Sequence, residues 1–198
     1  MCNIPEMGAV LLLGVLAGCG GGKRPAAADP AAAPAPAAAT AADAAAANCL
    51  PGAQGYLHAQ LRGALNTDLA WADAEMTCEG GGRPDGRGIR VSISGPLAKD
   101  RRLQLLFGID NRSATQSSPA LPTNITAILE GEKQLFATLG DDKCTTERLQ
   151  LIPLGTGSAQ RVEARGFCTG PASTLDGRDR LLVTTFEFSA RVVLPATP

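Results

Sequence analysis

The chain is poor in the residue types that most enzymes and metal proteins depend on. Its 198 residues include one histidine, His58, and only one tryptophan, one tyrosine and five phenylalanines. A single histidine excludes sites built from several histidines and leaves little choice of a general base near neutral pH. Few aromatic rings are available to line a sugar cleft. The sequence therefore favours a protein that is not an enzyme, with no cofactor and no metal.

The chain also lacks an excess of positive or of negative charge. The formal net charge is −1, with 18 Lys+Arg against 19 Asp+Glu. Two basic and three acidic residues precede residue 49, so segment 49–198 holds sixteen of each sign. A neutral domain has no electrostatic reason to bind a polyanion. We expect no nucleic-acid partner.

No apolar run is long enough to cross a membrane as a helix. The longest, Met7 to Gly18, has about twelve residues, too few for a hydrocarbon core of ~30 Å. That length is typical of the apolar region of a signal peptide, although Met1 to Glu6 lack the usual basic residues. Two explanations stay open, a misassigned start codon and a weakly charged natural signal. A buried N-terminal helix of a cytosolic protein is the less favoured alternative, because glycines and an Ala/Pro tract follow.

The apolar run ends in Leu16-Ala17-Gly18-Cys19, which resembles the lipobox of bacterial lipoproteins. In that family small residues precede the cysteine, and its thiol carries a diacylglycerol. The resemblance implies that residues 1–18 are a signal peptide and that lipidated Cys19 becomes the N-terminus. It also implies attachment to the cell envelope. Gly20 stands where an aspartate would retain the protein in the inner membrane, so we expect the outer membrane, facing the periplasm.

Residues 19–48 are expected to form a disordered tether behind the lipidated cysteine. Positions 20–47 contain 16 Ala and four Pro. Prolines interrupt any continuous helix in the first half, and eleven residues from Ala37 to Ala47 are marginal as a helix in water. Such a composition buries too little apolar surface to fold. At ~3.1 Å per residue, an extended tether would span tens of ångströms.

Residues 49–198 are expected to form one all-β domain, an antiparallel β-sandwich (jelly-roll or Ig-like) of about eight or nine strands. Ile89, Val91 and Ile93 alternate with polar residues, as in a half-buried strand. Glycine- and aspartate-rich turns separate such runs, a pattern typical of sandwiches. The Tyr56–Leu69 segment is ambiguous, because its leucines also match a helical stripe. The predicted strands are 57–65, 71–78, 89–93, 103–109, 124–130, 134–139, 144–151, 161–168 and 180–194, the last with Leu182, Phe186, Phe188, Ala190 and Val192 facing the core.

Four cysteines remain in the exported domain once Cys2 and Cys19 are set aside. An even number in an oxidising compartment indicates disulfides, and four cysteines allow three pairings. We favour Cys49–Cys78 and Cys144–Cys168, since each pair is closest in sequence and the second suits neighbouring antiparallel strands. A zinc site would need CxxC spacing or histidine partners, which are missing.

Three motifs suggest chemistry but have simpler explanations. Gly166-Phe-Cys-Thr-Gly170 has the outline of a nucleophile elbow, yet no histidine follows it, so a disulfide cysteine at a strand end is favoured. The glycine-rich stretch 80–88 lacks a P-loop lysine; Arg83 and Arg87 in it could meet an anion, but a surface turn is favoured. Asp141 and Asp142 offer oxygen ligands for Ca²⁺ without the alternating pattern such loops use.

The sequence leaves two hypotheses about the function of the domain. The stretch from Leu121 to Cys144, together with Arg165–Gly170, is similar to uncharacterised proteobacterial lipoproteins with β-rich domains, a resemblance that implies no activity. The leading hypothesis is a non-enzymatic envelope lipoprotein that binds or supports a periplasmic protein or glycan. The alternative is a small exported hydrolase or a lipid- or glycan-binding domain. The alternative requires a concave pocket lined by Trp71, Phe107 or Phe136 with convergent polar groups.

Overall fold

The structure is a computed structural model that describes residues 49–98, 100–111 and 120–194. The chain divides into two units, Met1–Ala39 and Thr40–Pro198, and every described residue belongs to the second. The predicted signal peptide, Cys19 and the whole predicted tether, residues 19–48, therefore lie outside the described residues. Within the described ranges the only helical element is a single turn, Asp73–Glu75. No helix there is long and apolar enough to cross a membrane.

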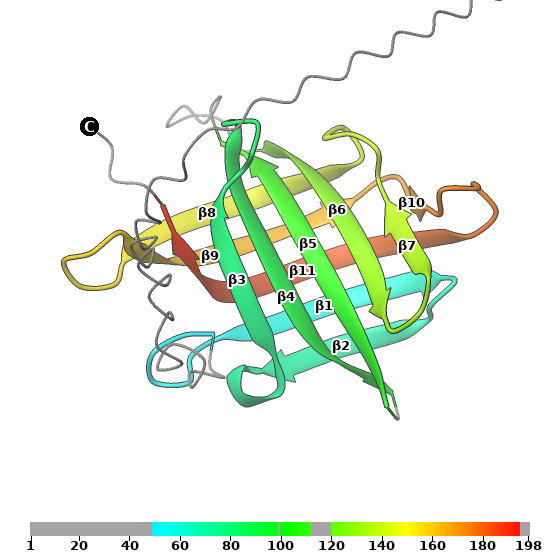
Figure 1. The fold of residues 1–198 in the computed structure, drawn as a ribbon. Helices are drawn as coiled ribbons and strands as arrows, with labels where there is room; N and C mark the ends of the chain where they lie inside the picture. The colour runs from blue at the N-terminus through cyan, green and yellow to red at the C-terminus, as the bar shows by residue number, and fades with distance from the viewer. Residues whose placement is uncertain (1–48, 99, 112–119, 195–198) are drawn as a thin grey trace, which may run out of the picture. The chain divides into compact units, whose positions relative to one another are not determined.

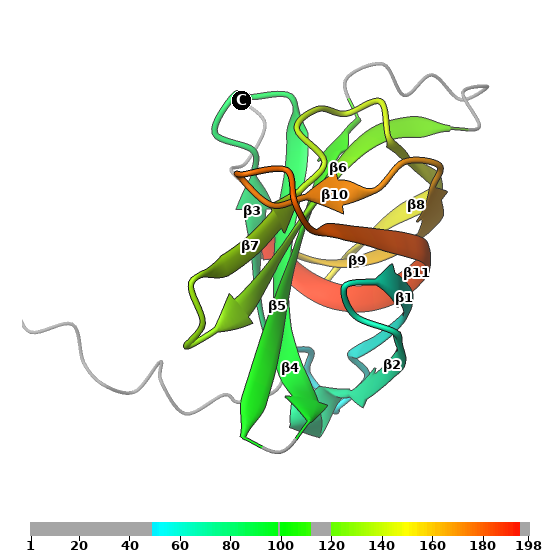
Figure 2. The same ribbon diagram turned by 90° about the vertical axis from the view of Figure 1, so that its right-hand side faces the viewer.

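The predicted all-β architecture is confirmed: the described residues form eleven strands in one continuous sheet that folds into two layers (Figures 1 and 2). Neighbouring strands are antiparallel, apart from a single parallel bridge between β3 and β11. The first layer is a meander in which each strand pairs with the next along the chain. Its strands are β3 (Thr77–Gly82), β4 (Gly88–Ala98), β5 (Arg101–Asp110), β6 (Leu121–Glu130) and β7 (Gln134–Ala137).

The second layer has the order β8-β9-β11-β1-β2 and lies behind the first, with its strands crossing those of the first layer steeply (Figure 1). Steep crossing is one of the two usual ways of packing two sheets. Short β10 (Ala172–Ser173) pairs with β7 and β11 and so links the layers. The strands of the second layer are β1 (Tyr56–Gly63), β2 (Thr67–Ala72), β8 (Cys144–Pro153), β9 (Ala159–Cys168) and β11 (Arg180–Val193).

A continuous apolar core lies between the two layers. The ring of Phe107 on β5 packs at a tilt against Phe186 and Phe188 of β11, with ring centroids 5.1 and 4.7 Å apart. These rings are almost completely buried, and alternate residues of nearly every strand join them. Burial of a large apolar side chain contributes about 1.5–3 kcal/mol, so this core supplies most of the driving force for folding.

Both favoured disulfides are present. Cys144 and Cys168 lie opposite each other on β8 and β9, with Cα atoms 3.9 Å apart. Cys49 bonds to Cys78 and ties the segment before β1 to β3, with Cα atoms 5.2 Å apart. Each bond therefore joins segments that are adjacent in the fold but 24 or 29 residues apart in sequence.

The predicted strand at residues 71–78 is wrong. The chain instead turns through Asp73–Glu75 and starts the first layer at Thr77. The buried carboxylate of Asp73 causes the turn, because its Oδ2 accepts hydrogen bonds from the backbone N–H groups of Leu50 (3.0 Å) and Gly55 (2.7 Å). Alternation alone could not reveal that an acidic residue at this position would point inward.

Two smaller corrections concern the strand ends. Gly80–Gly82, expected in a turn, belong to β3, since glycine lets Val192 and the backbone of β11 approach. Leu182 is only half-buried, whereas Leu181 and Val183 face the core. A β-bulge at Thr184 changes the register of β11 and reverses the alternation before it.

Candidate functional site

The aromatic pocket required by the hydrolase or lipid/glycan-binding hypothesis is not formed by the expected residues. Phe107 and Phe136 are completely buried in the core, and Trp71 is 4% exposed. Trp71 instead links the layers, since its indole Nε1 donates to the carbonyl oxygen of Pro96 on β4 at 2.8 Å. Its ring occupies the space that a Cβ at Gly95 would need. The pocket that the alternative hypothesis requires is therefore not lined by these rings.

The motif Gly166–Gly170 is structural. Gly166 and Cys168 lie on β9, and Cys168 is bonded to Cys144. A cysteine in a disulfide has no thiolate to act as a nucleophile. The disulfide explanation favoured from the sequence is confirmed.

Arg83, Arg87 and Asp141 meet in one ion-pair network at the end of the first layer. Arg83 contacts Asp85 at 2.8 Å and Asp141 at 3.2 Å. Arg87 contacts Asp110 at 2.6 Å and Asp141 at 3.5 Å. Because aspartates already neutralise both guanidinium groups, this turn makes a poor anion site. Asp141 is similarly occupied by arginines, which argues against a calcium ligand.

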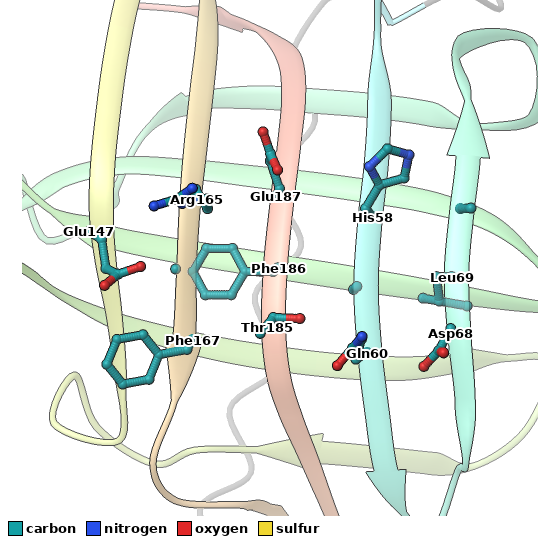
Figure 3. A pocket seen from close by; sticks show the side chains of 13 residues that line it. His58, Gln60, Asp68, Leu69, Glu147, Arg165, Phe167, Thr185, Phe186 and Glu187 are labelled. Carbon is teal, nitrogen blue, oxygen red and sulfur yellow. The ribbon is translucent and has the colours of Figure 1, made fainter.

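A groove of about 600 Å³ lies on the outer face of the second layer (Figure 3). We call it the outer groove. It runs across all five strands of that layer, and Figure 3 shows its polar side chains rising from separate strands. It is lined by His58, Ala59, Gln60, Asp68, Leu69, Ala70, Glu147, Arg165, Gly166, Phe167, Thr185, Phe186 and Glu187.

Two β-bulges shape the outer groove. On β8, Glu147 is an extra residue between Thr146 and Arg148, each of which has a partner on β9. On β11, Thr184 is the extra residue opposite Gln60 and Leu61. Bulges locally twist a strand and redirect side chains, and they are frequent beside functional sites. Here one bulge turns Glu147 outward into the groove.

Hydrogen bonds hold several groove side chains in place. The Tyr56 hydroxyl donates to Glu187 Oε1 at 3.2 Å, and the Tyr56 ring lies 5.3 Å from the ring of His58. Partial burial, and next the negative charge of Glu187, raise the pKa of Tyr56 above its ordinary value. The phenol therefore stays protonated and donates its hydrogen. Thr184 Oγ1 similarly donates to Gln60 Oε1 at 3.3 Å.

The charge of the outer groove is unbalanced. Asp68, Glu147 and Glu187 supply three carboxylates, and Arg165 supplies one guanidinium. Asp68 is already paired with Arg62 at 2.7 Å, outside the groove lining. Within the described part of the chain, neither Glu147 nor Arg165 has a hydrogen-bonding or ion-pair partner. The groove thus contains two carboxylates that are held in place, Asp68 by Arg62 and Glu187 by Tyr56, and one, Glu147, without a partner among the described residues.

Sequence reasoning placed His58 as an isolated residue and missed the rest of the groove. Its polar residues are the outward-facing members of five alternating strands, which look like ordinary solvent-exposed positions. Asp141 and Asp142 line a separate hollow of about 530 Å³ with Arg87, so the structure does not bring them to His58. In the described ranges no three His, Cys, Asp or Glu side chains are grouped to hold a metal ion.

Comparison with known protein families, with curated proteins and with solved structures found no match.

Proposed function

We propose that the protein is an envelope lipoprotein, lipidated at Cys19 and anchored in the outer membrane facing the periplasm. Residues 19–48 would act as a tether, and the β-domain as a non-enzymatic binding module. The lipobox-like sequence supports the anchor, and the two disulfides are consistent with an oxidising compartment. Acyl chains contribute about 0.8 kcal/mol per buried CH₂, which suffices for anchoring without a transmembrane helix.

The binding site in this proposal is the outer groove, and its ligand is a basic segment of another envelope protein. The observation that carries the proposal is the excess of carboxylates in the groove: Arg62 neutralises Asp68, and the two that remain, Glu147 and Glu187, face one guanidinium. Complementary charge mainly raises the association rate and selects the partner. Glu187, held by Tyr56, offers an acceptor that is already oriented before the ligand arrives.

The groove lining favours binding over catalysis. It contains His58 and three carboxylates but no serine and no cysteine, and Thr185 supplies its one aliphatic hydroxyl. In the described structure His58 contacts the Tyr56 ring and has no hydrogen bond to Thr185. Nucleophilic catalysis needs the base within hydrogen-bonding reach of such a group.

Fluorescence anisotropy with defined peptides tests the ligand class. The full chain in detergent micelles would be titrated into labelled eight-residue peptides of alternating lysine and serine, or glutamate and serine. We expect binding of the lysine peptide only, weakening as salt is raised. The double variant Glu147→Gln/Glu187→Gln should bind about tenfold more weakly, because exposed ion pairs each contribute about 0.2–1 kcal/mol.

Glu79→Gln is the matched control, since it removes one carboxylate from an exposed position of β3 in the other layer. It should leave peptide affinity unchanged. Equal binding of the glutamate peptide would contradict the proposal. So would loss of affinity in Glu79→Gln as large as that in the groove variant.

A further inference from the structure

β2 is the one strand in the described ranges that pairs on only one side. Its neighbour is β1, while every other strand has two or more partner strands, although β8 pairs with β6 only over Cys144–Thr146. An open strand edge presents unpaired N–H and C=O groups that can accept another strand. Asp68, Leu69 and Ala70 of β2 also form one rim of the outer groove.

The hydrogen bonds of neighbouring groups show which backbone groups point to the open edge. The N–H of Ala72 donates to Glu75 Oε2 at 2.9 Å, so it is turned away from β1. Directions alternate along a strand, and therefore the N–H and C=O groups of Asp68 and Ala70 also face the edge. No described residue bonds to these four groups. They form a short unoccupied ladder in the middle of β2.

The ladder is self-complementary about Leu69. A second copy laid antiparallel, with Leu69 opposite Leu69 of the partner subunit, places each Asp68 opposite an Ala70. This register forms four backbone hydrogen bonds and leaves the Glu75 bond to Ala72 intact. Ala70 has a small side chain, so the strands can approach closely. The two second layers then become one longer sheet.

Charge at the edge also matches this arrangement. Arg62 lies 2.7 Å from Asp68, and both side chains are largely exposed. A twofold axis at Leu69 brings a second Arg62–Asp68 pair to the same place, so the four charges sum to zero. The two Asp68 side chains are diagonal neighbours about 7–8 Å apart in such a pair, and each stays neutralised by Arg62 of its own subunit, which limits the repulsion between them.

We propose that two copies of the chain associate through an antiparallel β2–β2 pair centred on Leu69. The contact is small, so the dimer is weak in dilute solution. Its population on a membrane rests on the proposed lipid anchor, because tethering raises the effective concentration to about the millimolar range. The pairing itself does not depend on the anchor and is testable without it.

Cysteine crosslinking tests the register. The full chain would carry Cys2→Ser and Cys19→Ser, so that neither of these thiols can crosslink, and would be held at about 1 mM in mild detergent, the tethered concentration. The variants Asp68→Cys and Ala70→Cys are made distinguishable in mass. Each is oxidised on its own, and a mixture of the two reduced variants is oxidised in parallel. Facing Cα atoms about 5.5 Å apart can form a disulfide, whereas diagonal ones beyond about 7 Å cannot. We expect a heterodimeric disulfide in the mixture at least fivefold above either homodimer.

Ala70→Pro is the second variant. Its missing N–H faces the open edge and serves no bond within the described fold, so thermal unfolding should be unchanged. In sedimentation equilibrium the concentration-dependent dimer of the parent chain should disappear. An Ala70→Cys homodimer as the main product, or a monomer at 1 mM in the parent chain, would overturn the proposal. Neither result would count against the two other proposals, peptide binding in the outer groove and membrane attachment, which are measured in separate experiments on the parent chain.

Discussion

Gly166 of β9 lies directly opposite Phe186 of β11, and the Phe186 ring fills the space beside the glycine. A Cβ built at Gly166 would lie 2.6 Å from Phe186 Cζ and closer still to the backbone oxygen of Thr145. An aromatic ring packed over a sheet glycine covers backbone that would otherwise be left without side-chain contacts. This pair explains the glycine in Gly-Phe-Cys without any catalytic role.

Gly166→Ala should therefore destabilise the domain. Overpacking of this kind costs about 1–3 kcal/mol, and here one obstacle is backbone that cannot rotate away. The free energy of unfolding by urea measures the loss. Gly157→Ala is the control, since nothing lies within 4 Å of its added Cβ. Equal stability of the two variants would show that the Gly166–Phe186 contact is not close.

Asp73→Ala should destabilise by about 2–3 kcal/mol, because the backbone N–H groups of Leu50 and Gly55 would lose their charged acceptor. Asp73→Asn should cost less than half as much. Both N–H groups donate to the same oxygen, which an amide retains, and Oδ1 has no hydrogen-bond partner in the described structure. Urea unfolding of both variants compares them. Equal losses would mean that the negative charge, rather than the acceptor, holds the turn.

Stability should fall in acid as Asp85 becomes protonated. The N–H of Arg87, and then the Arg83 guanidinium, hold the pKa of Asp85 below its ordinary value of 3.8. A carboxyl group whose folded pKa is lowered stabilises fully above the unfolded value, and that contribution is lost as pH falls through the folded value. The free energy of unfolding would be measured at several values between pH 6 and pH 2 for the parent chain and for Asp85→Asn. It should fall less steeply with decreasing pH in Asp85→Asn than in the parent chain.

Asp142→Asn is the control for this titration, because Asp142 is exposed and bonds to no described residue. It should leave the shape of the acid decline unchanged. A decline that is the same in the parent chain and in Asp85→Asn would remove Asp85 from the explanation.

Each disulfide should contribute a similar stability. The bonds close loops of 29 and 24 residues, and chain entropy predicts about 3 kcal/mol for loops of this size. Cys49→Ala/Cys78→Ala and Cys144→Ala/Cys168→Ala would be compared with the parent chain by urea unfolding. Losses that differ by more than twofold would show that local packing outweighs the loop entropy.

The alternation of apolar and polar residues predicted the strands well where no turn or bulge interrupts it. Ile89, Val91 and Ile93 face the core as expected, and so do Phe186 and Phe188. The prediction failed at local irregularities, namely the turn at Asp73 and the bulge at Thr184. These depend on contacts with distant segments, such as Leu50 and Gln60, that no local pattern contains.

The outer groove could not be predicted for a related reason. Glu147 and Glu187 are 40 positions apart and become neighbours of one hollow only when β8, β9 and β11 pair. In the sequence each looks like a solvated carboxylate on an alternating strand. Pairing partners, and the bulge that turns Glu147 outward, are properties of the assembled sheet.

In the proposed function, a lipid on Cys19 holds the binding domain at a membrane. Fractionation of cells expressing the parent chain or Cys19→Ser tests it most directly, with Cys2→Ser as the control. The parent and Cys2→Ser chains should sediment with the membranes, whereas Cys19→Ser should not. Retention of Cys19→Ser in the membrane fraction, at the level of the parent chain, would show that a lipid on Cys19 does not anchor the protein.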